Sequence, residues 1–363
     1  MKFAHFAHIW GKTGMTPHQR YEQLWRELEL ADELGFDYGF CVEHHFRPDE
    51  SWMSSPGLYA VGAGARTRNM RVGAMGYIVP LYDPLRLAEE IAITDQMVGG
   101  RLEVGLVPGI NPLYFEPFDV DWDSRKPVTL EYVEFLRAAY GESQPFSFDG
   151  AHHHVASATL AVQPLQRPHP PFWMQSRDPA TLEFCAREGF DTGYFLIFPR
   201  AEAAPRYSKF LDDWRRAGWD RKPRIAYSTV VYVDETDQKA LDTALFGASR
   251  AYEGFLPPPE PGETFDDRVA RHAARFMSER GESGAAEIMG HLFDADYLLD
   301  NDLIFIGSPD TVTAKLKEAA TSGVFNTFMG EFNFHDLAED DLMRSIRLFG
   351  EHVIPALRDY QPF

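Results

Sequence analysis

Short apolar runs alternate with longer segments of helical period along most of this chain, and this alternation constrains its fold more than any other feature. An apolar run over residues 2–8 is followed by a helical pattern over 17–34, and Gly35 is the residue type that ends a helix in the left-handed conformation. A second apolar run over 37–43 follows at once. The unit recurs about every 30 to 35 residues, which is typical of strand–helix repeats and excludes a β-sandwich or a helix bundle.

Counting these units predicts an α/β fold, a (β/α)8 TIM barrel that forms a single domain over residues 1–363. The rhythm breaks at residues 254–300, where three consecutive prolines and a charged run indicate an insertion before the last unit, and we expect it to act as a mobile lid. The further predicted strands are 70–79, 101–107, 172–175, 191–197, 224–233 and 324–330, and the further predicted helices are 56–66, 84–98, 127–140, 179–188, 201–217, a helix from about 238, 309–321 and 337–358.

The charge balance narrows the possible partners. The chain has 55 acidic and 35 basic side chains and a formal charge of −20, so we expect neither nucleic acid nor a membrane as a partner. Cys41 and Cys185 lie in apolar runs and are too few for a disulfide framework, so we interpret both as core residues. The N-terminal residues do not resemble a signal peptide and no apolar stretch approaches membrane-spanning length, which predicts a cytoplasmic enzyme.

Active sites of such barrels lie at the carboxyl ends of the strands, and the second predicted strand ends in Glu43, His44 and His45. Imidazole titrates near neutral pH, which favours a proton-transferring histidine here. The alternative is a hydrogen-bonded Glu–His pair that orients the loop. Adjacent histidines on a strand point in opposite directions and HExxH spacing is absent, so we expect no metal. The run His152–His154 is interpreted as exposed residues of a hairpin and not as a set of metal ligands.

Two segments are candidates for holding a cofactor. The run Gly73–Pro80 is poor in bulky side chains, which permits either the approach of a flat group or tight packing within the barrel. The run Gln175–Pro179 begins a helix with free N–H groups, to which Ser176 and Arg177 add donors for an anion. Arg125 is a second candidate phosphate ligand, or else a surface ion pair. Motifs for a Rossmann dinucleotide site, a P-loop and a serine-hydrolase elbow are absent from the sequence.

Several motifs together resemble the bacterial luciferase-like flavin monooxygenases, and the resemblance covers nearly the whole chain. It implies a barrel that binds reduced FMN (FMNH2), activates O2 as a flavin C4a-hydroperoxide and oxygenates a small organic substrate by hydroxylation or Baeyer–Villiger chemistry. It also implies a two-component system in which a separate NAD(P)H:flavin reductase supplies the FMNH2. The motifs are Glu43–Phe46, Met70–Pro80, Pro84–Glu90, Asp95–Met97, Gly100–Arg101, Gly307–Thr311 and Leu348–Pro355.

The resemblance implies roles for individual residues. His44 falls on the family's catalytic histidine. Met75 and Gly76 fall where the family often has a non-proline cis peptide under the isoalloxazine ring. Arg125 and Ser176 match phosphate-binding positions of the luciferase α subunit.

Three positions depart from the family's pattern. Gln175 replaces a glutamate, Val107 replaces an active-site cysteine, and Pro108 replaces a phosphate-binding arginine. These departures put aldehyde luminescence in doubt. Arg177 offers a replacement for the missing arginine charge, so Gln175 and Arg177 are counted among the cofactor-binding candidates.

An oxygenase pocket must exclude water, so we expect apolar and aromatic residues near the strand ends to line it. We expect the segment 254–300 to cover this pocket. The residues predicted to line it are His8, Trp52, Tyr77, Trp173, Phe195 and Phe328.

The helix over 84–98 predicts a homodimer, because it carries more apolar surface than packing on a barrel needs. The alternative is that all of this surface is buried within one chain. Two other functions also stay open: a deazaflavin (F420)-dependent oxidoreductase of the same superfamily, which has no need of O2, and a non-catalytic flavin-binding or partner subunit. The residues that form the apolar surface are Leu87, Ala88, Ile91, Ala92 and Val98.

Overall fold

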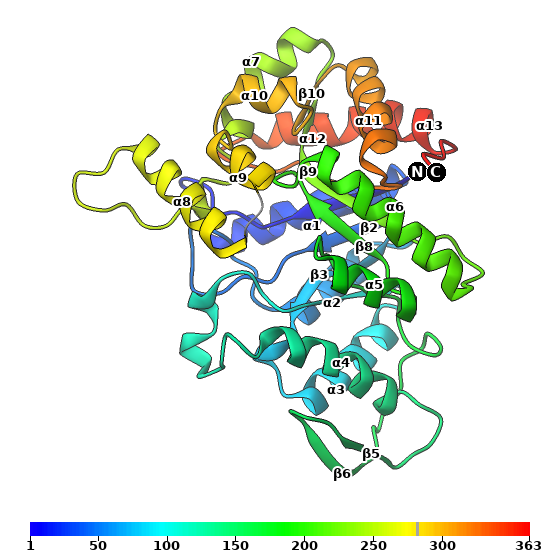
Figure 1. Ribbon diagram of the computed structural model, residues 1–363. Coiled ribbons are helices and arrows are strands. Elements are labelled where there is room, and N and C mark those ends of the chain that lie inside the picture. The colour runs from blue at the N-terminus through cyan, green and yellow to red at the C-terminus, as the bar shows by residue number, and fades with distance from the viewer. Residues whose placement is uncertain (281–282) are drawn as a thin grey trace.

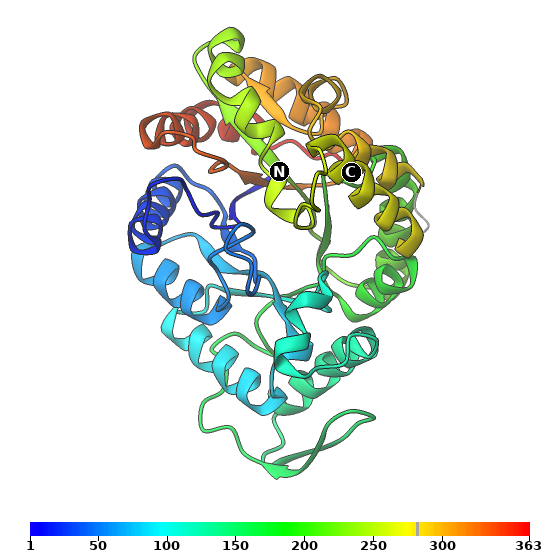
Figure 2. The same ribbon diagram turned by 90° about the vertical axis from the view of Figure 1, so that its left-hand side faces the viewer.

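The computed structural model describes residues 1–280 and 283–363, and the side chains outside 275–286. Parallel strands form a barrel with helices around it (Figure 1), and Figure 2 looks onto the face where the strands end. Each strand pairs with the next, and a single bridge between Trp173 and Asp191 joins β7 to β8 and completes the ring. The predicted (β/α)8 barrel is therefore confirmed. In ring order the strands are β1 (Lys2–Ala7), β2 (Tyr38–Cys41), β3 (Arg71–Ile78), β4 (Leu102–Val107), β7 (Phe172–Trp173), β8 (Thr192–Phe195), β9 (Ile225–Val233) and β11 (Thr327–Glu331).

The helices begin where the sequence has a capping residue before a proline or a helix former. Thr16 forms a capping box with Gln19 at the first helix, and Asp83 and Asp178 accept backbone N–H bonds at two others. These caps explain why the predicted helices begin close to their observed starts. The helices around the barrel are α1 (Pro17–Glu33), α2 (Pro56–Arg66), α3 (Pro84–Met97), α4 (Arg125–Ala139), α5 (Pro179–Glu188), α6 (Arg200–Ala217), α7 (Asp237–Ser249), α11 (Pro309–Gly323), α12 (Glu339–Leu348) and α13 (Ile354–Leu357), the last two joined by a π-helical turn over Phe349–Val353.

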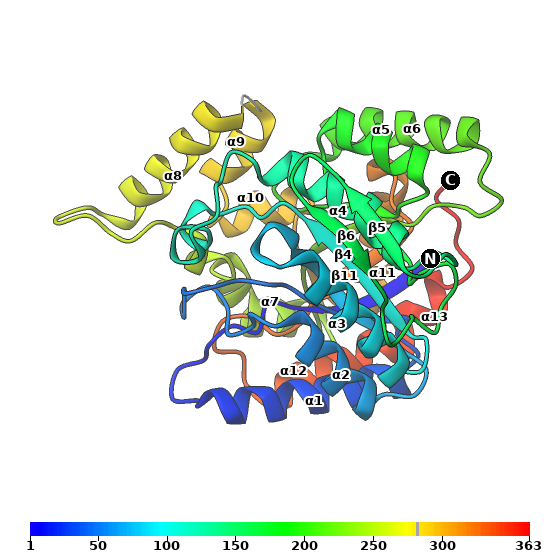
Figure 3. The same cartoon turned by 90° about the horizontal axis from the view of Figure 1, so that it is seen from below.

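The segment 254–300, predicted as an insertion, is largely helical. After a 3-10 turn at Glu253–Phe255 it contains three helices, of which α8 projects from the barrel face that carries the strand ends (Figures 1 and 3). Part of its charged run lies on α8, which is amphipathic. Residues 281 and 282 of this segment lie outside the described part of the chain. The three helices are α8 (Phe265–Arg280), α9 (Ser283–Gly290) and α10 (Ala295–Asp300).

Some predicted boundaries differ from the structure. β10 (Phe305–Gly307) was not predicted and pairs with the carboxyl end of β9. β11 begins at Thr327 and not at residue 324, because Val324 adopts a left-handed conformation (φ +55°) that ends α11. β7 is shorter than expected, and α4 begins two residues earlier, at Arg125. None of these differences changes the order of strands in the ring.

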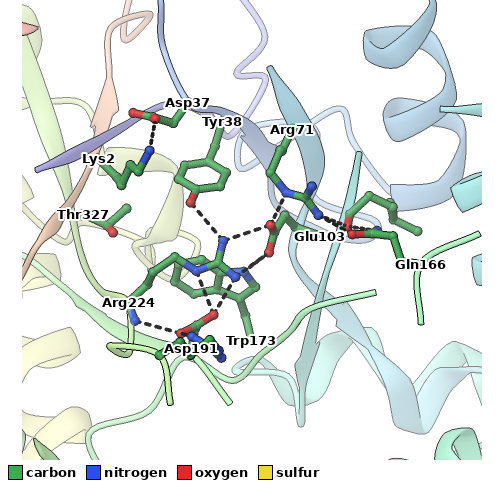
Figure 4. A network of polar contacts seen from close by, with 12 residues as sticks. Lys2, Asp37, Tyr38, Arg71, Glu103, Gln166, Trp173, Asp191, Arg224 and Thr327 are labelled. Carbon is green, nitrogen blue, oxygen red and sulfur yellow. Dashed lines mark hydrogen bonds and ion pairs between the residues drawn. The ribbon is translucent and has the colours of Figure 1, made fainter. Parts of the chain in front are cut away.

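A network of charged residues closes the amino-terminal end of the barrel, and we call it the floor (Figure 4). Glu103 of β4 accepts hydrogen bonds from Arg224 at 2.9 and 3.0 Å and from Trp173 Nε1 at 2.6 Å, and it also contacts Arg71. Asp191 accepts a further bond from Arg224 Nε at 2.8 Å. Both carboxylates are fully buried, so their charges depend on these partners.

The apolar residues of α3 that predicted a dimer are buried inside the single chain. All of them are at most 2% exposed, because they pack on the sheet and on neighbouring helices. The argument for a dimer from Leu87, Ala88, Ile91, Ala92 and Val98 is therefore wrong. Three large apolar side chains remain exposed on α3 and on α2, the helix beside it. They are Ile93 and Met97 of α3 and Leu58 of α2.

Two predictions about residues without a catalytic role are confirmed. Cys41 and Cys185 are buried free thiols in the core, and burial raises the pKa of Cys41 well above its usual value. The three histidines at 152–154 lie on the hairpin formed by β5 (Phe146–Asp149) and β6 (His154–Ala158). Within the described residues, no group of three or more His, Cys, Asp or Glu is arranged to hold a metal ion. The same residues include no helix long and apolar enough to cross a membrane.

Candidate active site

The carboxyl end of the barrel, which we call the mouth, holds a buried histidine with a carboxylate beside it. His44 follows β2, and its backbone N–H donates to the carbonyl of Met53 at 2.9 Å. Its Nδ1 lies 3.5 Å from Oε1 of Glu50, which also accepts a hydrogen bond from the Tyr114 hydroxyl. Burial, followed by the charges of His8 and His45, holds the pKa of His44 well below its usual value. His44 is therefore neutral at pH 7 and can accept a proton.

A second histidine–carboxylate pair lies beside the first. Nδ1 of His8 is 2.9 and 2.8 Å from the two carboxylate oxygens of Glu331, the last residue of β11. Glu331 also accepts hydrogen bonds from the indole N–H of Trp10 at 2.7 Å and from the Tyr252 hydroxyl at 3.3 Å. The carboxylate is fully buried and His8 is 3% exposed, so this pair is shielded from water.

The two imidazole rings are neighbours, tilted by 59° to one another, and share an aromatic cover. The ring centroids of His8 and His44 are 5.6 Å apart, and the ring of Phe255 lies 5.5 Å from each. Phe255 belongs to the 3-10 turn at the start of the segment 254–300. The guanidinium of Arg47 fixes this turn by donating to the carbonyl of Gly254 at 3.0 Å. The first residues of that segment thus cover both imidazoles.

The neighbours of His44 in the sequence orient the loop. Glu43 accepts hydrogen bonds from the backbone N–H of Ile78 at 2.7 Å and from the Tyr82 hydroxyl at 2.9 Å, and it lies 2.8 Å from Nε2 of His45. The hydrogen-bonded Glu–His pair considered from the sequence is therefore real, but it consists of Glu43 and His45. His44 is left to face the mouth.

The peptide bond between Met75 and Gly76 is cis, at the position that the resemblance implied. A Cβ added to Gly76 would overlap the backbone of Gly105 in the neighbouring strand, and one added to Gly73 would overlap the backbone of Glu103. Close packing of β3 on β4 thus accounts for these glycines. Met75 itself points into the barrel, where it joins the inner apolar cluster.

Two of the residues predicted to bind phosphate, Ser176 and Arg177, directly precede α5, whereas Arg125 begins α4. The Ser176 hydroxyl accepts the backbone N–H of Asp178 at 3.1 Å, and the Tyr207 hydroxyl donates to the Ser176 carbonyl at 2.7 Å. The guanidinium of Arg177 lies 5.9 Å from the ring centre of Phe198. Within the helix, Pro179 has no N–H, and the N–H groups of Thr181 and Leu182 already donate to Asp178. The donors for an anion at this helix start are therefore the side chains of Ser176 and Arg177.

Further positive charge lies near this helix start. Burial raises the pKa of Asp178, but hydrogen bonds from Thr181 and the charges of Lys126 and Arg206 outweigh it and keep the pKa low. Lys126 follows Arg125, whose guanidinium stacks 3.5 Å from the ring centre of Trp122 and donates to its carbonyl at 2.8 Å. In a chain with a formal charge of −20, this grouping of cations fits a phosphate.

Gln175, next to Ser176, places its side-chain amide inside the barrel. Its Nε2 is 3.8 Å from the sulfur of Met329, inside the barrel. Its Oε1 is buried and accepts no hydrogen bond from the described residues. A buried acceptor of this kind is open to an N–H group of a ligand. The donors near Ser176 and this acceptor together fit a flavin phosphate and ring.

The six residues predicted to line the substrate pocket lie in different parts of the barrel. His8 and Phe195 lie at the inner side of the mouth, where Phe195 packs 6.2 Å from Phe6. Tyr77 and Phe328 point outward and pack between the sheet and the helices, so their assignment to the pocket is wrong. Trp173 is inside the barrel but bonded to the floor. Trp52 lies in the loop after β2 and packs on Gly11 of the loop after β1.

Several residues of the mouth were not predicted. Glu331 directly follows the predicted strand 324–330, so the rule that sites lie at strand ends was sufficient to find it. Trp10 lies two residues after His8 but beyond the end of β1, where Ile9 is left-handed (φ +61°), so strand alternation could not have placed it. No local signal marks the others, which come from loops far apart in the sequence: Glu50, Tyr114, Tyr252 and Phe255.

Comparison with known proteins identifies the family. The model of the luciferase-like monooxygenases matches residues 1–326, so the chain belongs to this family and the resemblance is confirmed. An uncharacterized protein of Sinorhizobium fredii is 32% identical over 189 residues, 52% of this chain and 54% of that protein. The oxygenase component of the flavin-dependent trigonelline monooxygenase of Acinetobacter baylyi is 27% identical over 193 residues, 52% of each chain. This chain thus matches about half the length of each relative.

Two solved structures share the fold over almost the whole chain. Monooxygenase RslO1 from Streptomyces bottropensis superimposes with a TM-score of 0.79 at 25% identity, covering 98% of this chain and 99% of that one. An F420-dependent secondary alcohol dehydrogenase superimposes with a TM-score of 0.71 at 18% identity, covering 99% of each chain. At that identity the second likeness shows the fold alone.

Proposed function

We propose that this protein is an FMNH2-dependent monooxygenase, the oxygenase component of a two-component system, which oxygenates a small organic substrate by hydroxylation or Baeyer–Villiger chemistry. The observation that carries the proposal is the mouth: a neutral buried His44 with a carboxylate beside it and an aromatic cover above, in a barrel of the luciferase-like family. The flavin-dependent relative from Acinetobacter is itself named an oxygenase component, which supports a separate reductase as partner.

The cofactor would lie across the mouth with its phosphate at the start of α5. Ser176, Arg177 and Arg125 would hold the phosphate. Gln175 Oε1 and the Met75–Gly76 segment would contact the ring. Bound FMNH2 supplies the two electrons and two hydrogens with which one atom of O2 enters the substrate and the other leaves as water.

The chain's own contribution is to exclude water and to move protons. Phe255, Tyr252 and Trp10 cover the imidazoles, which keeps the site dry. His44 is neutral at pH 7, so its Nε2 can accept a proton from a reacting group and return it later. Glu50 lies toward Nδ1 of His44 and favours the orientation that leaves Nε2 for this exchange.

Binding of reduced cofactors tests this proposal against the F420-dependent alternative. Purified protein is titrated under anaerobic conditions with FMNH2 and, separately, with reduced F420, and binding is followed by cofactor absorbance. Each complex is then exposed to ¹⁸O2 with a panel of small ketones and aromatic compounds, and products are analysed by mass spectrometry. We expect FMNH2 to bind and ¹⁸O to enter an organic product.

Other results would contradict the proposal. Selective binding of reduced F420, with substrate turnover that needs no O2, would identify the alternative reaction. Binding of FMNH2 with no organic product and no effect of His44→Ala on its reoxidation would indicate a non-catalytic flavin-binding subunit. Direct oxidation of NADH by the purified chain with FMN would remove the need for a separate reductase.

A further inference from the structure

The pair formed by His8 and Glu331 has no role in the function proposed so far, although it lies beside His44. We propose that His8 is a second proton-transfer residue of the mouth, that Glu331 positions it, and that it acts as the acid where His44 acts as the base. The inference rests on the proposed oxygenase function and assigns the proton chemistry of the same site.

The contacts of Glu331 fix the orientation of the His8 ring. The carboxylate accepts hydrogen bonds from the backbone N–H of His8 at 3.2 Å, from the indole of Trp10 at 2.7 Å and from the Tyr252 hydroxyl at 3.3 Å, besides its contacts with Nδ1. Because a carboxylate only accepts, the proton between it and the ring belongs to Nδ1. Nε2 is then the nitrogen left for a ligand, and no described residue hydrogen-bonds it.

The surroundings favour a positive charge on His8 over one on His44. Both oxygens of Glu331 lie within 2.9 Å of the His8 ring, whereas Glu50 is 3.5 Å from His44 and its Oε1 already accepts the Tyr114 hydroxyl. With ring centroids 5.6 Å apart, an imidazolium at one position disfavours a second at the other. Two adjacent groups with different preferred protonation states are the arrangement from which acid and base roles follow.

The two roles balance over one turnover. His8 enters as imidazolium and gives its Nε2 proton to the oxygen atom that leaves as water, and Glu331 keeps its charge throughout. His44 enters neutral and takes up at Nε2 a proton released when the cofactor is oxidised. Transfer of that proton from His44 to His8 restores the starting state, so the site neither gains nor loses a proton.

The order of protonation also depends on the other charged and titratable groups around the two rings. They come from three loops and the end of β11, and each must be kept unchanged in the test. These groups are Glu331 of β11, Glu50, His45 and Arg47 of the loop after β2, Tyr114 of the loop after β4, and Tyr252 before the 3-10 turn.

Nuclear magnetic resonance of the cofactor-free protein tests the assignment without relying on activity. The ring nitrogens of ¹⁵N-histidine-labelled protein are followed from about pH 9 down to about pH 5, with His8→Asn and His44→Gln used for assignment. We expect His8 to carry its neutral-form proton on Nδ1 and to become charged while His44 is still neutral. Protonation of His44 before His8, or a neutral His8 with its proton on Nε2, would overturn the proposal.

Activity of the reconstituted oxygenase provides the second measurement. In His8→Asn the amide can still donate to Glu331, so folding is preserved while the transferable proton is lost. We expect about a tenfold or greater loss of organic product at pH 7, and loss of the high-pH decline of the rate profile. Exposed His154 supplies the control variant His154→Gln, which leaves both measurements unchanged.

The two proposals fail in different ways. If the wild-type protein forms no oxygenated product, the proposed function fails, and the order of protonation alone decides the assignment of His8. If the wild type is active and His8→Asn retains its product yield and pH profile, the acid role of His8 is wrong while the proposed function stands.

Discussion

The two ends of the barrel both bury charged side chains, but they satisfy them differently. At the floor, Glu103 and Asp191 face the guanidinium groups of Arg71 and Arg224, which cannot lose their charge. At the mouth, Glu50 and Glu331 face imidazoles, which change charge near neutral pH. Permanent ion pairs stabilise the fold, whereas histidine–carboxylate pairs can move a proton. The position of active sites at strand ends thus corresponds here to a difference in the cationic partner.

Unsatisfied polar atoms show the same contrast. The mouth holds buried atoms without a hydrogen bond from any described residue, namely Nδ1 of His44, Oε2 of Glu50 and Oε1 of Gln175. In the floor network every carboxylate oxygen of Glu103 and Asp191 has a donor. A ligand can compensate unsatisfied atoms, so the mouth is the end prepared for binding.

The largest expected effect is on stability and comes from the floor. Glu103→Ala leaves the guanidinium groups of Arg71 and Arg224 without their shared carboxylate, so we expect a loss of about 3 to 5 kcal/mol in the free energy of unfolding, measured with urea. The exposed pair of Glu89 and Arg86 gives the control, and Glu89→Ala should cost less than about 0.5 kcal/mol. Equal effects of the two variants would contradict a stabilising role for the floor.

The floor also predicts how stability depends on pH. Burial raises the pKa of Glu103, but Arg224 and Arg71 outweigh it and lower the pKa below the ordinary value. A lowered pKa stabilises the fold above the pKa of the unfolded chain, and this contribution is lost as the pH falls through the pKa of the folded state. The difference in stability between wild type and Glu103→Ala should therefore shrink below about pH 4.

The second effect is on catalysis and comes from the mouth. His44→Ala should lower substrate oxygenation about 100-fold, because a positioned proton-transfer group is lost, while the urea midpoint changes little. Product is measured with saturating FMNH2, and His154→Ala is the control because His154 lies on the exposed hairpin. If His44→Ala forms as much product as the wild type, His44 has only a structural role. The proposal that the mouth moves a proton through His44 would then be wrong.

The third effect is on the oligomeric state and comes from the side of the barrel, away from the floor and the mouth. Leu58, Ile93 and Met97 remain exposed on α2 and α3, and we expect this surface to form a homodimer. Met97→Glu should shift the sedimentation coefficient to that of a monomer at micromolar concentration without changing FMNH2 binding. Phe246→Glu is the control, because Phe246 is exposed on α7 instead. A monomeric wild type would rule out the homodimer.

The sequence was informative about elements and less so about which way their side chains point. The alternation of apolar runs and helical segments was sufficient for the barrel, and the strand-end rule led to His44. The same sequence could not separate Tyr77, which points outward, from Met75, which points inward. Parallel strands with both faces buried are apolar throughout, so they lack the alternation that reveals a side chain's direction.

Contacts between distant loops were beyond the reach of sequence patterns for another reason. Glu50 meets Tyr114 across 64 positions, and His8 meets Glu331 across 323. Such contacts depend on the closure of the ring, and each residue alone is a common type in a common setting. The sequence predicts an insertion at 254–300 but not its helices, because prolines and a charged run interrupt the strand–helix rhythm there, whereas α8 is amphipathic.

The smallest expected effect concerns the cover of the mouth. The segment 254–300 contacts the mouth through Phe255, and Arg268 holds the following chain by donating to the carbonyl of Pro257 at 2.5 Å. Because α8 projects from the barrel (Figure 1), we expect trypsin to cut here first, at sites that include Arg268 and Arg271. FMN should slow this cut a few-fold by favouring the closed form, whereas inorganic phosphate, which lacks the ring, should slow it less. The cut is followed by mass spectrometry of the fragments.

If the first cuts fall elsewhere, or if FMN leaves their rate unchanged, the segment is a fixed part of the surface. Phe255 would then cover the imidazoles as a fixed residue, and the mouth would differ from the floor in its charges but not in its motion.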